Sequence, residues 1–244
     1  MRCLAFFVAL PVVAFAQDKP PIQPDRPGFS DGTGIVGKRT LEIETGKSSS
    51  FDSGHPTLSW GDAVLRYGLG GNLELRLVGV TYLMAPGGAK GWGDPGFGFK
   101  YRLLRADKGR PDVSLIGLTT VPVGASDVRD NEWNPTFKLA WNLPTGDDAV
   151  YGNLVWSRVG TGPDRFSQSA VSLGYGHAVN ERDGMGLEMW WVDHTSLDGP
   201  GAGFAGFSFT HLLNPNIQLD IELQTGLDQH KDGYLFSTGI AVRF

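Results

Sequence analysis

Charged side chains alternate with apolar ones through much of this sequence, and acids and bases occur on neighbouring segments. Gathered in one enclosed space, such groups can pair as ions or form a polar constriction that a small solute must pass. The charges with this spacing are Glu42, Glu44, Arg66, Glu74, Arg76, Lys100, Arg102, Lys138, Glu188, Asp220, Glu222 and Arg243. Whether these charges come together depends on the secondary structure of the segments that carry them.

These charges lie on segments with the period of a β-strand. In residues 217–224, aliphatic side chains alternate with glutamine, aspartate and glutamate. A period of two places alternate side chains on opposite faces of an extended strand. Residues 234–244 alternate in the same way and end on Phe244, an aromatic terminus typical of strands that close outer-membrane barrels.

Twelve segments have strand-like patterns, and an even number brings both ends of a barrel to the same side. They are 38–48, 60–68, 72–82, 92–104, 111–121, 134–143, 149–157, 165–178, 184–193, 202–212, 216–227 and 233–244. The connections are short on one side and longer on the other, for example 49–59 and 122–133, as in bacterial outer-membrane barrels. We predict an all-β fold, a single antiparallel transmembrane β-barrel of about twelve strands over residues 37–244.

The charged faces are assigned to the interior, because an Arg or Lys that faces lipid near the bilayer midplane costs about 2–4 kcal/mol. A soluble β-sandwich is the alternative, but abundant glycine and charge on one face suit a wet lumen better. Arg66 then lies between strands that carry Glu42 and Glu74, and closure brings Arg243 near acids of two other strands. This ring of ion pairs has two interpretations: it holds a narrow barrel together, or it forms a solute constriction.

Aromatic residues fall near the strand ends, as two interfacial girdles require. The outer set is Trp60, Tyr82, Trp92, Trp133, Trp156 and Tyr234, and the inner set is Tyr67, Tyr101, Trp141 and Phe244. Alternation places Trp190 and Tyr151 in the lumen. Together with Tyr82 and Trp92 at the outer mouth, they would favour an apolar or aromatic solute.

The start of the chain predicts export. Residues 1–16 contain Arg2, an apolar run and a small-x-small cleavage site before Gln17, which is the pattern of a secretory signal peptide. The one cysteine, Cys3, lies in this segment, so we expect the exported chain to have neither thiol nor disulfide.

Residues 17–36 are rich in Pro, Gly and Asp and have no periodicity, which predicts an irregular periplasmic leader. Asp25 and Arg26 precede a proline, and this charged, stiff element could enter the periplasmic mouth as a plug that pairs with Arg102 or Glu74. A disordered tether is the alternative.

The composition gives little support to other functions. The formal net charge is −5, so no basic surface for nucleic acid is expected. The sequence Asp193-His194-Thr195-Ser196 gathers acid, imidazole and hydroxyl groups, but Leu197 stands where outer-membrane lipid hydrolases have Asn in their His-x-Ser-Asn element. The remaining histidines, His55, His177, His211 and His230, are dispersed, so we expect no metal site, no cofactor and no enzyme.

Several ordered motifs resemble one known family. They lie at residues 24–32, 65–76, 93–103 and 121–124. Through them the sequence resembles the transporter-like outer-membrane proteins labelled "MetA-pathway of phenol degradation". The resemblance implies an outer-membrane β-barrel of a Gram-negative bacterium, a transporter linked by name to aromatic compounds, and no settled catalytic residues.

The predicted function is therefore passive or facilitated passage of small molecules, aromatic or apolar compounds among them. A closed structural or surface-interaction barrel without conduction is one alternative, and an outer-membrane lipid hydrolase is another. The expected partners are outer-membrane lipids, the solute, and the barrel-assembly machinery, which would read the C-terminal strand that ends at Phe244.

Overall fold

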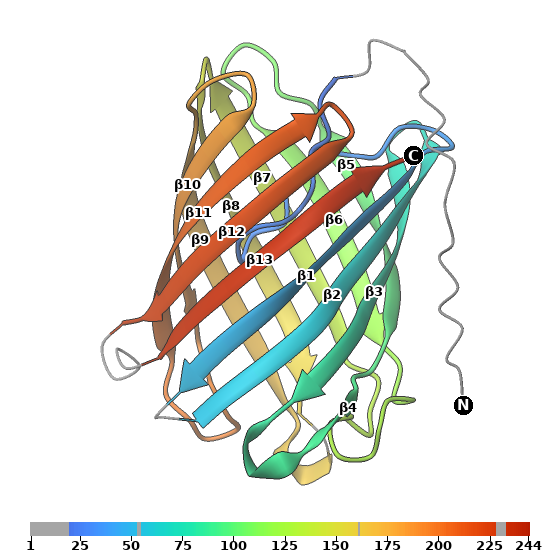
Figure 1. Cartoon of the computed structure of the whole chain (residues 1–244), viewed down its shortest axis with the longest axis vertical. Helices are drawn as coiled ribbons and strands as arrows, with labels where there is room; N and C mark the ends of the chain where they lie inside the picture. Colours follow the sequence, from blue (N-terminus) through green and yellow to red (C-terminus); the bar gives the residue numbers. More distant parts are fainter. Residues whose placement is uncertain (1–19, 53–54, 161, 228–232) are drawn as a thin grey trace, which may run out of the picture.

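The computed structural model describes residues 20–52, 55–160, 162–227 and 233–244. The predicted signal peptide, residues 1–16, lies outside the described residues. In the described part, one 13-stranded antiparallel sheet contains all the strands, and two short 3-10 helices lie in connections (Figure 1). No helix within these ranges has the length and apolar character needed to cross a membrane.

The sheet closes on itself, because the twelve longer strands pair in chain order, with β3 next to β5, and β1 pairs with β13. The barrel strands are β1 (Leu41–Asp52), β2 (His55–Gly70), β3 (Leu73–Met84), β5 (Gly96–Leu104), β6 (Asp112–Thr120), β7 (Pro135–Thr145), β8 (Asp148–Val159), β9 (Phe166–Ala178), β10 (Asp183–Val192), β11 (Ala202–Asn214), β12 (Ile217–Gly226) and β13 (Tyr234–Arg243). The short β4 (Lys90–Trp92) pairs with the end of β3 and follows η1 (Pro86–Gly88), while η2 (Gly162–Asp164) joins β8 to β9. The prediction of an all-β antiparallel barrel of about twelve strands is confirmed.

Two predicted boundaries are wrong for physical reasons. The expected strand 92–104 is divided into β4 and β5, and Pro95 lies between them, where it has no N–H to give to a sheet. The expected loop 49–59 is mostly strand, since β1 and β2 remain paired as far as Asp52 and His55. The serines of this tip obscure its alternation in the sequence, but Phe51 stacks on Tyr234 and backbone pairing satisfies the N–H and C=O groups of the tip.

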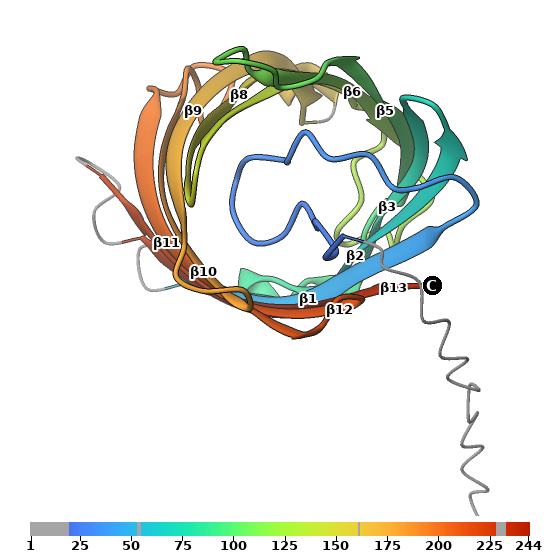
Figure 2. The same cartoon turned by 90° about the horizontal axis from the view of Figure 1, so that it is seen from above.

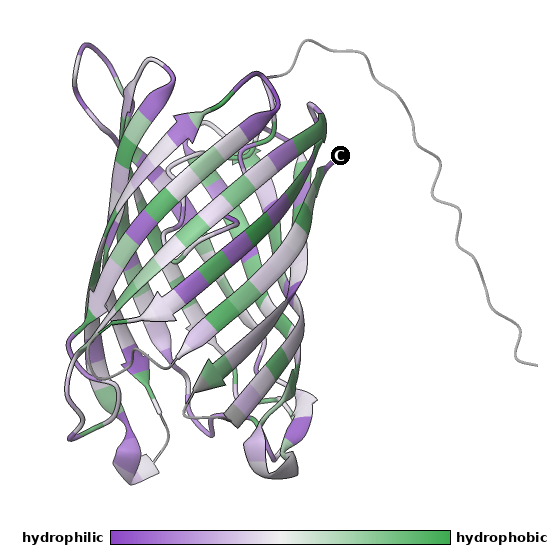
Figure 3. Cartoon of the chain, turned by 60° about the vertical axis from the view of Figure 1, so that its left-hand side comes forward, coloured by the Kyte–Doolittle hydropathy of each residue, from purple (hydrophilic) through white to green (hydrophobic). Residues whose placement is uncertain are grey.

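The two faces of the sheet differ as predicted. On β12, Leu219 and Ile221 are 38% and 42% exposed, whereas Asp220 and Glu222, which alternate with them, are only 3% and 6% exposed. Figure 3 shows the same alternation of hydrophobic and hydrophilic residues along the visible strands. The apolar faces point outward to where lipid lies, and the charges point into the barrel.

Aromatic pairs form at the end of the barrel that carries the longer connections. Ring centroids lie 5.5 Å apart in Tyr82–Trp92 and 6.1 Å apart in Phe137–Trp156. The Nζ of Lys47 lies 4.7 Å from the ring centroid of Trp60. Such exposed aromatic rings at a strand end are typical of a membrane interface.

The opposite end carries the short turns and the C-terminus, and by the usual asymmetry of bacterial barrels it faces the periplasm. Residues 20–40, which we call the leader, start here: Ile22 N donates to Pro215 O at 2.8 Å, beside the turn between β11 and β12. From this end the leader loops through the inside of the barrel before β1 begins (Figure 2).

Candidate functional site: the leader inside the barrel

The leader contacts the barrel wall around most of its circumference. Its backbone and side chains form hydrogen bonds or ion pairs with side chains of β1, β2, β3, β5, β6, β7, β8, β9, β10, β12 and β13. These contacts are nearly all polar, because the inward faces of the strands carry charges, hydroxyls and amides. The site is therefore an internal segment held across a polar lumen.

Asp25 is the centre of the basic side of the site. Its carboxylate oxygens lie 2.6 and 2.8 Å from Lys100 Nζ, it pairs with Arg76 Nη2, and it lies 3.8 Å from Arg66 Nε. Burial alone would raise the pKa of this carboxyl group. The three surrounding cations outweigh burial and lower the pKa below its usual value.

Asp31 forms the second acidic contact of the leader. Arg76 Nη1 donates to its Oδ1 at 3.0 Å, and Lys138 Nζ pairs with its Oδ2. The backbone of Asp31 is held by Asn153, which accepts from its N–H at 3.0 Å and donates to its carbonyl at 3.1 Å. Burial again opposes ionisation of this carboxyl, but Lys138 and Arg76 outweigh it and lower the pKa.

Arg26 points to the other side of the lumen. Its Nη2 lies 3.2 Å from Asp220 Oδ1 and 3.2 Å from Ser237 Oγ. Gly46 and Gly239 are paired across β1 and β13, and a Cβ at either position would lie only 2.6 or 2.4 Å from the Arg26 guanidinium. The two glycines thus provide the space that this side chain occupies.

Acidic side chains on this side of the lumen accept hydrogen bonds from the backbone of the leader. Glu188 Oε2 accepts from Phe29 N at 2.9 Å, and Glu188 Oε1 accepts from Ser30 N at 3.1 Å and from the Ser30 hydroxyl. Glu44 accepts from the backbone N–H groups of Asp25 and Arg26 at 3.1 and 3.0 Å. These two strand carboxylates thus fix the backbone of the leader at two places along its course.

One part of the contact is aromatic. The Phe29 ring stacks on Trp190 with centroids 5.3 Å apart, and Trp190 stacks on Phe204, also at 5.3 Å. Trp190 is therefore in the lumen, as predicted from its alternation. Tyr151 also turns inward, where it lies across Gly174.

Contrary to the prediction from the sequence, Tyr82 and Trp92 do not line the outer mouth of the lumen. Trp60 is paired with Tyr82 and Tyr82 with Trp92, so the three rings share one face of the sheet. Lys47, whose neighbours in β1 point into the lumen, covers Trp60 on this face. The three rings therefore belong to the exterior of the barrel and not to its lumen.

Arg66 forms a separate cluster that is completed by the strands. Its guanidinium lies 2.8 Å from Glu42, 3.1 Å from Glu44 and 2.9 Å from Glu74. The leader adds two backbone acceptors, the carbonyl groups of Gln23 and Gly34. Arg66 thus lies between acids of β1 and β3, the two strands beside β2, as the predicted strand order indicated.

The remaining charges predicted for the lumen have other partners. Arg102 donates to Thr33 O at 3.4 Å and lies 3.8 Å from Asp112. Glu222 accepts from Gln224 at 2.5 Å. Arg243 donates to Asn216 and to the Pro20 carbonyl, although Glu42 is its register partner, so closure does not give it a close ion pair.

The predicted leader contacts were wrong in their partners. Asp25 was expected to meet Arg102, and Arg26 to meet Glu74, but Glu74 instead accepts from Val36 N at 2.9 Å. Asp31 and Ser30 were not among the predicted site residues, although both lie in the motif at 24–32. An irregular segment has no periodicity from which its contacts can be read.

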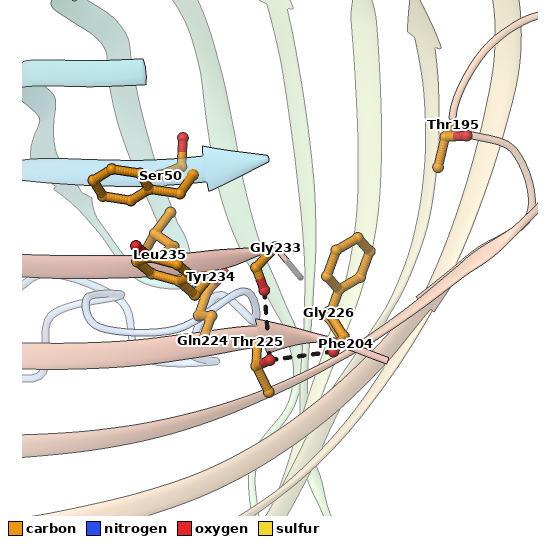
Figure 4. A pocket seen from close by; sticks show the side chains of 10 residues that line it. Ser50, Thr195, Phe204, Gln224, Thr225, Gly226, Gly233, Tyr234 and Leu235 are labelled. Atoms are coloured by element: carbon orange, nitrogen blue, oxygen red, sulfur yellow. Dashed lines mark hydrogen bonds between the residues drawn. The ribbon is translucent and has the colours of Figure 1, made fainter. Parts of the chain in front are cut away.

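Cavities remain on both sides of the leader. One of about 430 Å³ opens at the periplasmic end beside Arg66 and Arg243, and one of about 260 Å³ lies between the leader and Tyr151. At the outer mouth a mainly apolar cavity of about 280 Å³ is lined by Phe204 and Leu235 among others (Figure 4). This outer cavity therefore meets the aromatic stack at Phe204.

The residues of the hydrolase alternative do not form a catalytic arrangement. His194 Nδ1 lies 3.1 Å from Asp193 Oδ1, but no hydrogen bond between His194 and Ser196 occurs among the described residues. Thr195 instead donates to the Pro200 carbonyl within the loop. Among all the residues that the structure describes, no group of three or more His, Cys, Asp or Glu side chains could hold a metal ion.

A closed antiparallel barrel with an apolar exterior and a charged interior defines a bacterial outer-membrane protein. Residues 24–244 match the family described as "Putative MetA-pathway of phenol degradation", and the chain belongs to this family. It is thus an outer-membrane β-barrel of a Gram-negative bacterium, consistent with the resemblance that its motifs indicated.

Two solved structures are similar to this chain in fold. The KdgM porin in complex with disordered oligogalacturonate has a TM-score of 0.56 and 9% identity, with 83% of this chain and 99% of that chain covered. The NanC porin has a TM-score of 0.58 and 11% identity, with 83% and 98% covered. Identities this low show the fold alone. No curated protein matches the sequence.

Proposed function

We propose that the barrel gives small molecules passive passage across the outer membrane and that the leader closes the lumen until it moves. The contacts of the leader support this proposal, because ion pairs and hydrogen bonds can be exchanged for contacts with water as a segment leaves a polar lumen. No cofactor and no catalytic group is needed for such passage, and the role is non-enzymatic.

The observation that carries the proposal is the aromatic stack that joins the leader to the outer mouth. Phe29 of the leader, Trp190 of β10 and Phe204 of β11 are stacked, and the mainly apolar cavity of about 280 Å³ begins at Phe204. Offset stacking of rings contributes about 0.5–1.5 kcal/mol beyond burial of their area. An aromatic or apolar solute entering from outside would thus contact the rings of Phe204 and Trp190.

Planar-bilayer conductance and liposome swelling test this function. The intact chain and a chain without residues 17–34 would be compared with phenol, simple sugars and amino acids as solutes. We expect low conductance from the intact chain and steady conductance with faster swelling after the deletion. A folded barrel that conducts in neither form would contradict the proposal and favour the closed structural barrel.

The C-terminal strand supports a second, smaller proposal about assembly. β13 presents Tyr234 and Phe236 on its outer face, and the exposed Phe244 follows it at the periplasmic end. We propose that the barrel-assembly machinery recognises this strand before it pairs with β1. Replacement of Phe244 by Ser should then reduce the amount of folded barrel in the outer membrane without affecting refolding in detergent.

A further inference from the structure

The cations on one side of the lumen have carboxylate partners from the leader. Arg76, Lys100 and Lys138 lie on β3, β5 and β7, which are close together in the barrel wall. Asp25 pairs with Arg76 and Lys100, and Asp31 pairs with Arg76 and Lys138. We call these three cations the basic wall.

The strands themselves offer the basic wall little neutralising charge. Within the described residues, no strand carboxylate lies within 4.0 Å of Lys100 Nζ or Lys138 Nζ, and the nearest to Arg76 is Glu74 at 3.8 Å. Lys100 has no exposed side-chain surface. A buried cation that loses its partner is costly, so removal of the leader leaves a site that favours a new anion.

We infer that the basic wall is a binding site for the carboxylate group of a small solute, and that Asp25 and Asp31 occupy this site in the closed barrel. The inference rests on the proposed function, because the leader must move before a solute can take its place. The leader's own carboxylates then act as internal competitors of the solute.

The geometry of the site suits carboxylates. Lys100 Nζ contacts both oxygens of Asp25, and Arg76 directs one guanidinium nitrogen to Asp25 and another to Asp31. The planar guanidinium and the ammonium group are the usual partners of a carboxylate. The wall therefore has room for two carboxylates in the positions that the leader now fills.

The opposite wall increases the selectivity. Glu188, Asp220 and Glu222 face the lumen from β10 and β12, and they are held by leader groups that leave with it, such as the Arg26 guanidinium on Asp220. A vacated lumen would therefore have a basic wall facing an acidic wall. A carboxylate is attracted to the first and repelled by the second, which fixes its position in the lumen.

Displacement of the leader can be measured by the accessibility of a single thiol. Thr33 is 6% exposed and lies in the docked leader, where its carbonyl accepts from Ser114 Oγ at 2.8 Å. The purified barrel would carry Thr33→Cys together with Cys3→Ser, and its reaction with a thiol reagent would be followed. Benzoate, benzyl alcohol and benzylamine present one ring with different charges, and sodium chloride at equal ionic strength controls for screening.

Benzoate should accelerate the labelling, whereas the alcohol, the amine and the salt should not. At a concentration about ten times the dissociation constant of the vacated site, benzoate should increase the undocking equilibrium constant about tenfold. Equal acceleration by benzoate and benzyl alcohol, or acceleration by chloride alone, would overturn the inference.

Variants of the basic wall test the residues themselves. Lys138→Gln should label faster without solute, since Asp31 loses a partner, and should respond less to benzoate. Lys138→Arg should restore the response, and Lys47→Gln is the matched control, because it removes a cation that lies over Trp60 outside the lumen. An unchanged benzoate response in Lys138→Gln and in Lys100→Gln would contradict the site.

Failure of the carboxylate site and failure of the proposed passage would give different results. If the barrel without residues 17–34 passes neutral solutes but benzoate never displaces the leader, the carboxylate site is wrong and passage stands. If no solute passes that barrel, passage is wrong, and the labelling series still decides whether carboxylates bind the basic wall.

Discussion

Arg66 and Lys100 are both fully enclosed in the barrel, but different parts of the chain neutralise them. Arg66 is surrounded by Glu42, Glu44 and Glu74, which belong to the adjacent strands β1 and β3. Lys100 meets the two oxygens of Asp25, which belongs to the leader. Arg66 therefore keeps three strand carboxylates without the leader, whereas the ion pair of Lys100 depends on the leader.

The difference separates a structural part of the lumen from a part that can change. The Arg66 cluster ties β1, β2 and β3 together close to the closure of the barrel, and its three carboxylates belong to the strands. In the proposed opening, the basic wall would exchange the carboxylates of the leader for those of a solute. A barrel can therefore keep its shape while the charge of its lumen changes.

The largest expected effect is on the Arg66 cluster. Arg66→Ala would leave three buried carboxylates without their cation, and breaking a buried ion pair in this way costs about 3–5 kcal/mol. Urea unfolding of the barrel in lipid vesicles measures the loss. Arg66→Lys is the control that keeps the charge, and the cost should remain in the chain without residues 17–34. An equal loss for Lys100→Ala in that shortened chain would remove the distinction between the two clusters.

The second-largest effect is expected on docking of the leader, with little change in the stability of the barrel. Asp25→Asn keeps the size of the side chain but removes the charge that Arg76 and Lys100 share, at a cost to docking of about 1.5–3 kcal/mol. We expect more frequent channel opening in planar bilayers and faster labelling of Thr33→Cys, with little change in urea unfolding. Asp94→Asn, in a loop where Asp94 accepts from Gly124 N, is the control. Loss of barrel stability equal to that of Arg66→Ala would contradict the comparison.

Acid should act on the same contacts. The pKa values of Asp25 and Asp31 are lowered in the docked leader, so the docked form binds fewer protons than the released form at acid pH. Docking is therefore fully favoured above the ordinary aspartate pKa of about 3.9 and weakens as the pH falls below it. Conductance of the intact chain should stay low from about pH 7 to about pH 5 and rise below about pH 4.

A chain with both Asp25→Asn and Asp31→Asn provides the control for this pH series. Its conductance should be high at neutral pH and should lack the acid transition, since neither side chain can take up a proton. If the intact chain opens near neutral pH instead, the leader is controlled by groups other than these two carboxylates.

The sequence predicts the barrel well because a membrane enforces the pattern that reveals it. Between lipid and lumen, a strand such as β12 must alternate Leu219 and Ile221 with Asp220 and Glu222. Beyond the membrane this requirement ends, so the sequence predicts a loop where β1 and β2 form a paired tip. The same alternation predicts that a charge such as Asp220 faces the lumen.

The partners of those charges could not be predicted in the same way. Asp25 and Lys100 are 75 residues apart, and Asp25 lies in a segment without periodicity. Strand pairing brings Glu42 and Glu74 beside Arg66, since all three lie on neighbouring strands. Nothing comparable ties an irregular leader to a particular height in the barrel, so the contacts of its Ser30 and Asp31 with the strands appear only in the folded chain.

The smallest expected effect is on the aromatic path, and two adjacent tryptophans allow a matched test. Trp190 lies in the lumen between Phe29 and Phe204, whereas Trp191 is 49% exposed on the outer face. In the barrel without residues 17–34, Trp190→Ala should lower the swelling rate with phenol relative to a pentose by a factor of about 2–10, equivalent to about 0.5–1.5 kcal/mol. Trp191→Ala should leave this ratio unchanged, because its ring faces lipid. Equal effects of the two substitutions would show that the ratio reflects barrel stability, and the lumen rings would then have no part in solute preference.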